Sequence, residues 1–278
     1  MILVDRNQFY RSIAMNSNAG SEQVGPLRAQ LTPVEDYKTV RISDVSDEEV
    51  HRVVNDIRRD GFAEVRNFVL SGQGAMEEFV LDAIAANHDE YISFTGTDAL
   101  AQTPFGAVAR DPSFVRLLKR VYEIGLNLPP PEQPIYQVLR CLKGASGLQH
   151  SLKFHYDSYV VTALLPVFIP TAGVTGDLLM LKRRRNIRRH YVHNLVDKIR
   201  LDNPITQRIL RGRYEANSRS LMRVKISPGN LYFFWGYQTV HANERCDVNQ
   251  LRATALFHYN NPHADSFLRQ FTSREVQG

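Results

Sequence analysis

The chain has few cysteines and no long apolar run, and each absence excludes a class of protein. Only Cys141 and Cys246 occur among its 278 residues, too few for a disulfide framework or for a thiolate cage around a metal ion. No run of about 18 apolar residues is present, so the sequence predicts no membrane span. Residues 1–4 are apolar, but Asp5 and Arg6 follow and leave them too short for a signal-peptide core. A cytoplasmic protein with reduced cysteines is the expectation.

Positive charge is in excess, but it is concentrated in one segment. The formal net charge is +5 at pH 7, and residues 182–213 contain eleven Lys and Arg against two acidic residues, Asp197 and Asp202. A local excess of this kind describes one partner or substrate and not the whole fold. We therefore expect an anionic small-molecule substrate, and nucleic acid is not the expected partner.

The first half of the chain predicts helices around one strand. Residues 1–40 lack a sustained periodicity and are expected to form a loose N-terminal arm. Capping residues followed by apolar positions at helical spacing predict three helices, at about 47–59, 75–91 and from 111 onward. Alternation of apolar and polar residues predicts a strand at 62–68. We expect the helices to brace the outside of a sheet.

From residue 135 the chain predicts mostly strands. Short apolar and β-branched runs predict eight of them, at about 135–142, 152–157, 160–168, 176–181, 222–227, 230–235, 238–242 and 251–259. Eight strands can close into a double-stranded β-helix, a cupin-like jelly-roll barrel that places ligands at one open end. The predicted fold is mainly β with flanking α-helices, in a single domain over residues 41–278. A basic helical insert is expected at about 182–220, between the fourth and fifth of these strands.

Three polar residues match a known set of metal ligands. His155 and Asp157 precede the apolar run 160–168, and side chains two apart on a strand point to the same face. A His-x-Asp alone arises by chance in many chains, but His241 follows the turn and strand at 227–235. Two histidines and one carboxylate form the facial triad that holds Fe(II) in non-haem oxygenases. We predict that these three residues bind a metal ion.

Arg252 is a single charge inside the apolar run 250–257. An unpaired cation is costly in such a strand, so Arg252 is expected to have an anionic partner. Its guanidinium can bind a carboxylate bidentately, while Thr254, on the same strand face, donates a hydroxyl to it. A dicarboxylic co-substrate would provide this partner.

At these residues the chain resembles the Fe(II)/2-oxoglutarate-dependent dioxygenases, most closely the phytanoyl-CoA-dioxygenase-like small-molecule hydroxylases. The shared pieces are the His-x-Asp, the Pro-Gly-Asn turn at 228–230 with its following strand, His241, and the Arg-Ala-Thr at 252–254. The segment 136–144 is also similar to a strand of that family. The resemblance covers roughly 61–262 and fades in the first forty residues and in the basic stretch after Leu181.

The resemblance implies that His155, Asp157 and His241 are the catalytic ligands of Fe(II). It also implies that 2-oxoglutarate chelates the iron and places its far carboxylate on Arg252 and Thr254. O2 would be the other co-substrate, and the reaction would hydroxylate an unactivated C–H bond while releasing succinate and CO2. Further candidates for contacts with the co-substrate or substrate are Gln137 and Lys143, which share a strand face, and Arg140, which would face the other way. For Arg140, a solvated or ion-paired outer position and a role in the site are both open.

Other functions stay open. A desaturase or a ring-forming oxygenase would use the same ligands, a protein or nucleic-acid hydroxylase would use the basic insert, and a barrel that lacks metal chemistry would only bind. The insert is expected either to select the substrate, with Arg184 and Arg185 as the residues to test, or to be a solvated helical face. Trp235, Tyr237 and Asn243 flank the third ligand and are candidates for the pocket wall, although core packing is favoured for Trp235.

Overall fold

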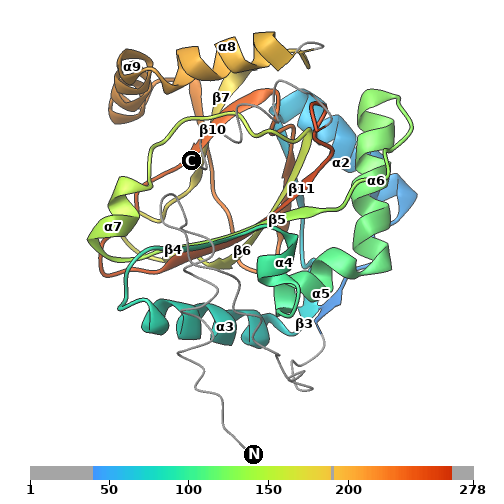
Figure 1. The fold of residues 1–278 in the computed structure, drawn as a ribbon, viewed down its shortest axis with the longest axis horizontal. Coiled ribbons are helices and arrows are strands. Elements are labelled where there is room, and N and C mark those ends of the chain that lie inside the picture. The colour runs from blue at the N-terminus through green and yellow to red at the C-terminus, as the bar shows by residue number, and fades with distance from the viewer. Residues whose placement is uncertain (1–39, 189–190, 265–278) are drawn as a thin grey trace, which may run out of the picture.

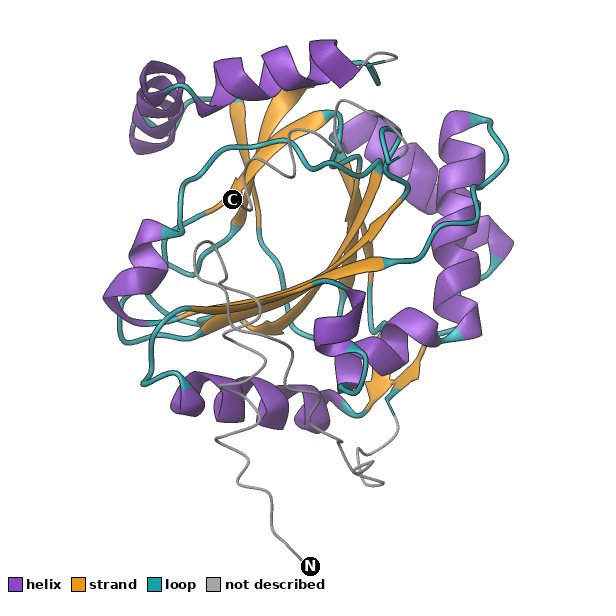
Figure 2. Ribbon diagram, viewed as in Figure 1, coloured by secondary structure: helices purple, strands orange, loops and turns teal. Residues whose placement is uncertain are grey.

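Two antiparallel sheets lie opposite each other in the computed structural model, which describes residues 40–188 and 191–264 (Figures 1 and 2). The larger sheet contains, in spatial order, β2 (Phe62–Val65), β9 (Leu231–Phe234), β6 (Val161–Phe168), β11 (Arg252–Tyr259), β5 (Tyr136–Leu142) and β4 (Ile92–Thr95). The smaller sheet contains β10 (Thr239–Asn243), β7 (Leu178–Arg184) and β8 (Leu221–Val224). A separate pair joins β1 (Arg41–Ile42) and β3 (Val69–Ser71). The predicted jelly-roll fold is confirmed, as two facing sheets and not as a closed barrel.

One of the predicted strands does not form. Residues 152–157 follow β10 closely, because the backbone N–H groups of Leu152, His155 and Asp157 donate to carbonyls of residues 243, 241 and 236. Only His155 makes a bridge of the ladder type, with His241. The left-handed φ of +54° at Leu152 interrupts the extended backbone there.

Eight helices lie between or beside these strands in the described residues. They are α2 (Asp47–Asp60), α3 (Gln73–Ala86), α4 (Thr97–Leu100), α5 (Pro104–Arg110), α6 (Pro112–Leu126), α7 (Gly144–Gln149), α8 (Tyr191–Asp202) and α9 (Pro204–Glu215). The predicted helix at 47–59 is confirmed, with the Ser46 side chain accepting a hydrogen bond from the Glu49 N–H. Asp111 caps α6 as expected. The second predicted helix ends at Ala86, five residues early.

Strand alternation separates the larger sheet into a helix-covered face and an interior face. The helix-covered face contributes Leu139 from β5, Leu165 from β6 and Phe257 from β11 to the main apolar core, together with residues of α2, α3, α5 and α6. The residues between them on the same strands, such as Thr254, point to the interior between the two sheets. Figure 1 shows α3, α5 and α6 outside the larger sheet and α8 and α9 beside the smaller one.

Among the described residues, no helix combines the length and the apolar character that a membrane crossing requires.

The main core depends on aromatic packing between α3 and the larger sheet. Phe79 is 1% exposed, and its ring centroid lies 5.5 Å from that of Phe94 on β4 and 5.8 Å from that of Phe105 on α5. Replacing Phe79 with Ala should lower the free energy of unfolding by about 3–5 kcal/mol, because a large cavity replaces these contacts. Urea unfolding followed by circular dichroism measures the change.

Leu81→Ala is the matched control on the same helix. Leu81 is 51% exposed, so its replacement should change the free energy of unfolding by no more than about 0.5 kcal/mol. Equal losses in the two variants would contradict this description of the core.

Candidate active site

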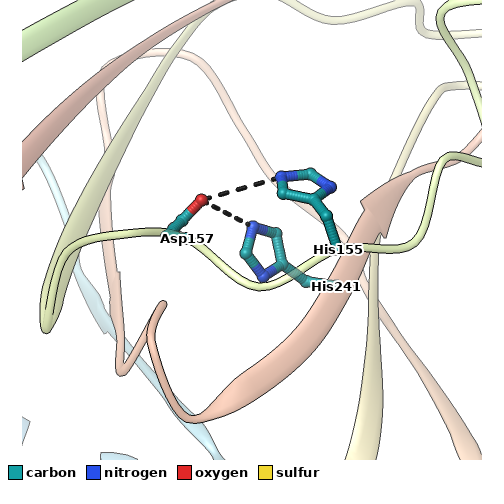
Figure 3. Close-up of side chains that lie close together, drawn as sticks. All are labelled: His155, Asp157 and His241. Carbon is teal, nitrogen blue, oxygen red and sulfur yellow. Dashed lines mark ion pairs between the residues drawn. The ribbon is translucent and has the colours of Figure 1, made fainter. Parts of the chain in front are cut away.

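Three side chains converge in the interior between the sheets (Figure 3). His155 and Asp157 belong to the extended segment beside β10, and His241 lies on β10 itself. The Asp157 Oδ1 atom is 3.4 Å from Nε2 of His241 and 3.6 Å from Nε2 of His155. One ligand atom from each residue lies within 4.8 Å of the other two. The structure therefore brings together the three residues that the sequence suggested.

Hydrogen bonds fix the tautomer of both imidazoles. Nδ1 of His155 lies 2.9 Å from the Lys153 carbonyl oxygen, and Nδ1 of His241 lies 3.0 Å from the Thr239 carbonyl oxygen. A carbonyl oxygen only accepts, so each Nδ1 must carry a hydrogen and donate. In the neutral form, the lone pairs on Nε2 then face Asp157. This arrangement is the one that metal-ligating histidines use.

The Asp157 carboxylate is held from its other side. The Thr162 hydroxyl donates to Oδ2 at 2.5 Å and in turn accepts from Nδ1 of His258, 3.1 Å away. This series of hydrogen bonds, from His258 through Thr162, engages Oδ2 of Asp157. Oδ1 therefore remains to face Nε2 of His155 and Nε2 of His241. Sequence reasoning missed both Thr162 and His258. The signal was available for His258, which is two strand positions beyond Leu256 and therefore on the same interior face as Arg252.

The electrostatics of the three residues favour a bound cation. Burial opposes ionisation of Asp157, but His241, His258 and His155 together outweigh it and hold the pKa of the carboxyl well below its usual value. Burial and the neighbouring His241 lower the pKa of His155, so this imidazole is neutral at pH 7. Burial also lowers the pKa of His241, but the Asp157 carboxylate more than offsets this and raises it. A divalent cation can take the place of the proton that Nε2 of His241 would otherwise bind.

The bonding state of His241 gives a second reason to expect a metal ion at these three residues. Nε2 of His241 is buried and makes no hydrogen bond of normal geometry within the described part of the chain, and its contact with Oδ1 of Asp157 is 3.4 Å long. A buried polar atom without a partner is costly, and metal coordination removes that cost. Two neutral imidazoles and one ionised carboxylate suit Fe(II) and similar divalent ions.

Arg252 lies in the same interior, 2% exposed. Its Nε donates to the Gly176 carbonyl at 2.6 Å and its Nη1 to the Thr254 hydroxyl at 3.3 Å. Burial lowers the pKa of Arg252 to about 10, so the guanidinium remains charged at neutral pH. Within residues 40–188 and 191–264 it makes no ion pair with a carboxylate. An anion that enters this interior would find a charged partner at Arg252.

Gln137 and Lys143 do not reach this interior, in contrast to the expectation. Gln137 pairs with Phe257 across β5 and β11 and shares the helix-covered face of the sheet. Lys143 lies beyond the end of β5 and forms an ion pair with Asp89 at 2.7 Å. Arg140, for which both an outer position and a site role were open, lines the interior beside the metal-ligand candidates. The strand phase was right, and the choice of inward face was wrong.

Arg184 and Arg185 also lie elsewhere than expected. Arg184 donates to the Ile57 and Arg58 carbonyls at the end of α2. Arg185 stacks over the Tyr156 ring and pairs with Asp197 at 2.8 Å. Both side chains are therefore occupied by contacts within the fold, and neither lines a cavity beside His155.

The three residues that flank His241 in the sequence, Trp235, Tyr237 and Asn243, lie in different surroundings. Trp235 packs in the main core, where a Cβ at Gly125 of α6 would lie 2.2 Å from its ring. Tyr237 is buried, and its hydroxyl is 2.9 Å from Nε2 of His263. Asn243 alone lines the interior cavity.

Two cavities meet at this site. A small one of about 50 Å³ lies between the metal-ligand candidates and Arg252, with an apolar wall that includes Leu164, Phe234 and Leu256. A large cleft of about 1140 Å³ lies outside it, and α9 lines one side of that cleft. Arg140 and His155 line both cavities. Of the metal-ligand candidates, His155 thus borders the large cleft, whereas Asp157 and His241 line the small cavity.

Gly236 is the position at which the geometry of Asp157 is most easily disturbed. A Cβ there would lie 2.2 Å from Oδ2 of Asp157 and 2.3 Å from Oγ1 of Thr162, so alanine must displace the carboxylate. Gly236→Ala should weaken Co(II) binding by roughly ten- to a hundredfold, the usual effect of losing a group that orients a ligand. Absorption titration of the metal-free protein measures the affinity.

Gly74→Ala, within α3, serves as the control because a Cβ there meets nothing within 4 Å. Its Co(II) affinity should equal that of the wild type. A Gly236→Ala protein with unchanged Co(II) affinity would rule out Asp157 as a ligand held in this position.

No protein-family model and no curated protein sequence matches the chain. Among solved structures it is similar to a prolyl hydroxylase from Trichoplax adhaerens in complex with a hypoxia inducible factor peptide fragment, at TM-score 0.51 and 13% identity over 79% of this chain and 93% of that one. It is also similar to prolyl 4-hydroxylases from Phytophthora capsici (TM-score 0.49, 10% identity, 89% and 80% covered). A third is the dioxygenase for auxin oxidation 1 from Arabidopsis thaliana, bound to 2-oxoglutarate (0.48, 11%, 78% and 90%). The first likeness shows that this chain shares the fold of that prolyl hydroxylase, whereas the phytanoyl-CoA-dioxygenase-like subfamily is not confirmed.

Proposed function

We propose that the chain is an Fe(II)- and 2-oxoglutarate-dependent dioxygenase that hydroxylates a small molecule. The observation that carries the proposal is the convergence of His155, Asp157 and His241, with one ligand atom from each within 4.8 Å of the others. The resemblance of the sequence motifs and the shared fold support it. The described residues would form a single oxygenase domain that includes α8 and α9.

The three residues would hold Fe(II) and leave coordination positions for co-substrate and O2. Bound there, Fe(II) and 2-oxoglutarate supply the oxidising power for attack on a C–H bond, with release of succinate and CO2. The tasks of the chain are to fix the ligands and to limit the access of water. Thr162 and His258 serve the first task by orienting Asp157, and the apolar wall of the small cavity serves the second.

Arg252 and Thr254 would bind the far carboxylate of 2-oxoglutarate. A guanidinium that is buried, charged and without a carboxylate partner in the described residues is suited to this task. The small cavity has room for about two water molecules at 30 Å³ each, less than the co-substrate needs. Side chains at the junction with the large cleft, Arg140 first among them, would therefore move when it binds.

Replacement of Asp157 tests the proposed chemistry. Asp157→Ala removes the only carboxylate of the ligand set and should abolish 2-oxoglutarate-dependent formation of succinate in protein reconstituted with Fe(II) under anaerobic conditions and then exposed to O2. Asp98→Ala, which removes an exposed carboxylate on α4, should keep wild-type activity. Thermal unfolding of both variants shows whether they are folded. Succinate formation at the wild-type rate by folded Asp157→Ala protein would sink the proposal.

Replacement of Arg252 tests the co-substrate site separately. Arg252→Gln shortens the side chain and removes its charge and its bidentate donor fork, so the affinity for 2-oxoglutarate should fall on the order of a hundredfold. Calorimetric titration of the Mn(II)-loaded protein with 2-oxoglutarate under anaerobic conditions measures this. Arg200→Gln, on the exposed part of α8, should leave the affinity unchanged, and an unchanged affinity in Arg252→Gln would contradict the assignment.

A further inference from the structure

The large cleft beside His155 collects basic side chains from separate parts of the chain. Its lining includes five of them, Arg140, Lys153, Arg208, Arg211 and Arg245. Only two acidic residues, Asp202 and Glu215, line the same cleft. The excess of positive charge therefore borders the opening that leads to the metal-ligand candidates.

These five cations are not neutralised by the fold. None of them forms an ion pair with a carboxylate in the described residues, although Arg211 donates to the Leu152 carbonyl at 3.3 Å. In contrast, Arg185 and Arg188 share Asp197, and Arg223 pairs with Glu244 at 2.7 Å. Arg185, Arg188 and Arg223 are thus paired with carboxylates, whereas the five cations that line the cleft keep their charge available.

Helix α9 is fixed in place next to the first metal-ligand candidate. The Gln207 side chain accepts from the Phe154 N–H at 3.1 Å and donates to the Phe154 carbonyl at 2.8 Å. At the other end of α9, the Tyr214 hydroxyl donates to Glu244 at 2.7 Å. Because both ends are held, Arg208 and Arg211 are presented to the cleft by a supported helix. A group bound to them would lie on the wall next to His155.

The same cleft contains apolar surface. Pro204 and Ile205 line it, and Ile205 is 70% exposed. An apolar side chain that exposed on a cleft wall suits contact with the carbon skeleton of a ligand. The cleft therefore combines a cationic wall with an apolar one.

We propose that this cleft binds the substrate, and that the substrate is a small organic molecule carrying a multiply charged anionic group, phosphate or carboxylate. Arg208 and Arg211 of α9 bind the anion together with Lys153 and Arg245, while the carbon skeleton extends past Arg140 toward His155. That the bound molecule is oxidised rests on the proposed function. The binding of the anion does not, since none of these four residues is a candidate metal ligand.

Anion binding is tested on the full-length, metal-free chain, so that the probe cannot bind to iron. Pyrophosphate and citrate, titrated calorimetrically at low salt, distinguish phosphate from carboxylate as the favoured group. For the anion that binds the wild type, the Arg208→Gln/Arg211→Gln double variant should bind at least about tenfold more weakly, because two charge-assisted contacts are lost. The wild-type affinity should also fall as salt is added.

The matched control is Arg213→Gln, which removes an exposed cation from the same helix but outside the cleft lining. Its affinity should stay within about twofold of the wild type, since exposed charges contribute little individually. The inference is overturned if the wild type binds neither anion, or if the double variant and the control bind alike. Arg208-dependent binding of a single-stranded oligonucleotide without binding of either small anion would also overturn it.

Chemical modification gives a reading that does not depend on folding of a variant. Phenylglyoxal should label Arg208, Arg211 and Arg213 in the wild type, and pyrophosphate or citrate should protect the first two only, as mapped by mass spectrometry. Equal labelling with and without the anion contradicts the inference. If protection is seen but Asp157→Ala still forms succinate, the cleft stands and the proposed reaction fails. If the anion gives no protection but Asp157→Ala loses succinate formation, the proposed reaction stands and the cleft is rejected as the anion site.

Discussion

Charged and polar groups buried between the two sheets impose the main constraint on this structure. Asp157 is 9% exposed and Arg252 is 2% exposed, and a charge removed from water is costly unless partners compensate for it. Asp157 finds its partners in Thr162, His258 and the two metal-facing imidazoles. Arg252 has one backbone carbonyl and one hydroxyl. Within the described residues, Asp157 is thus well supplied with partners, whereas Arg252 lacks a carboxylate partner in the same interior.

The rigidity of that interior comes from the other face of the larger sheet. Each interior residue of β11 alternates with a core residue, so Thr254 and His258 are flanked by Ala253, Ala255 and Phe257 packed against the helices. The antiparallel register fixes Thr254 opposite Arg140 and His258 opposite Thr162. Packing of α3 and α6 therefore determines where the polar side chains stand, although the helices contribute none of them.

The sequence was most informative where one local pattern decided the structure. Capping at Ser46 and Asp111 and the apolar run around Arg252 predicted two helices and the strand of Arg252, and His155, Asp157 and His241 were chosen from residue type and spacing. It failed where the answer depended on a partner far away. A strand has two faces, so Gln137 and Arg140 could be assigned only relative to each other until the helices were known to cover the Gln137 face. The contacts of Arg184 with the end of α2, 126 and 127 positions away, leave no local signal at all.

Helix α9, which lies between β7 and β8 in the sequence, connects the wall of the large cleft to the residues just before His155. Gln207 clamps the backbone of Phe154, the residue directly before His155, and Arg211 holds the Leu152 carbonyl on the same short segment. Residues 152–157 do not form a regular strand, so they lack the continuous ladder of hydrogen bonds that fixes the neighbouring strands. Their position depends on α9 and also on β10, since the backbone groups of His155 and His241 exchange two hydrogen bonds of 3.0 Å. The α9 residues that line the cleft and the first metal-ligand candidate are thus joined through the backbone of Phe154.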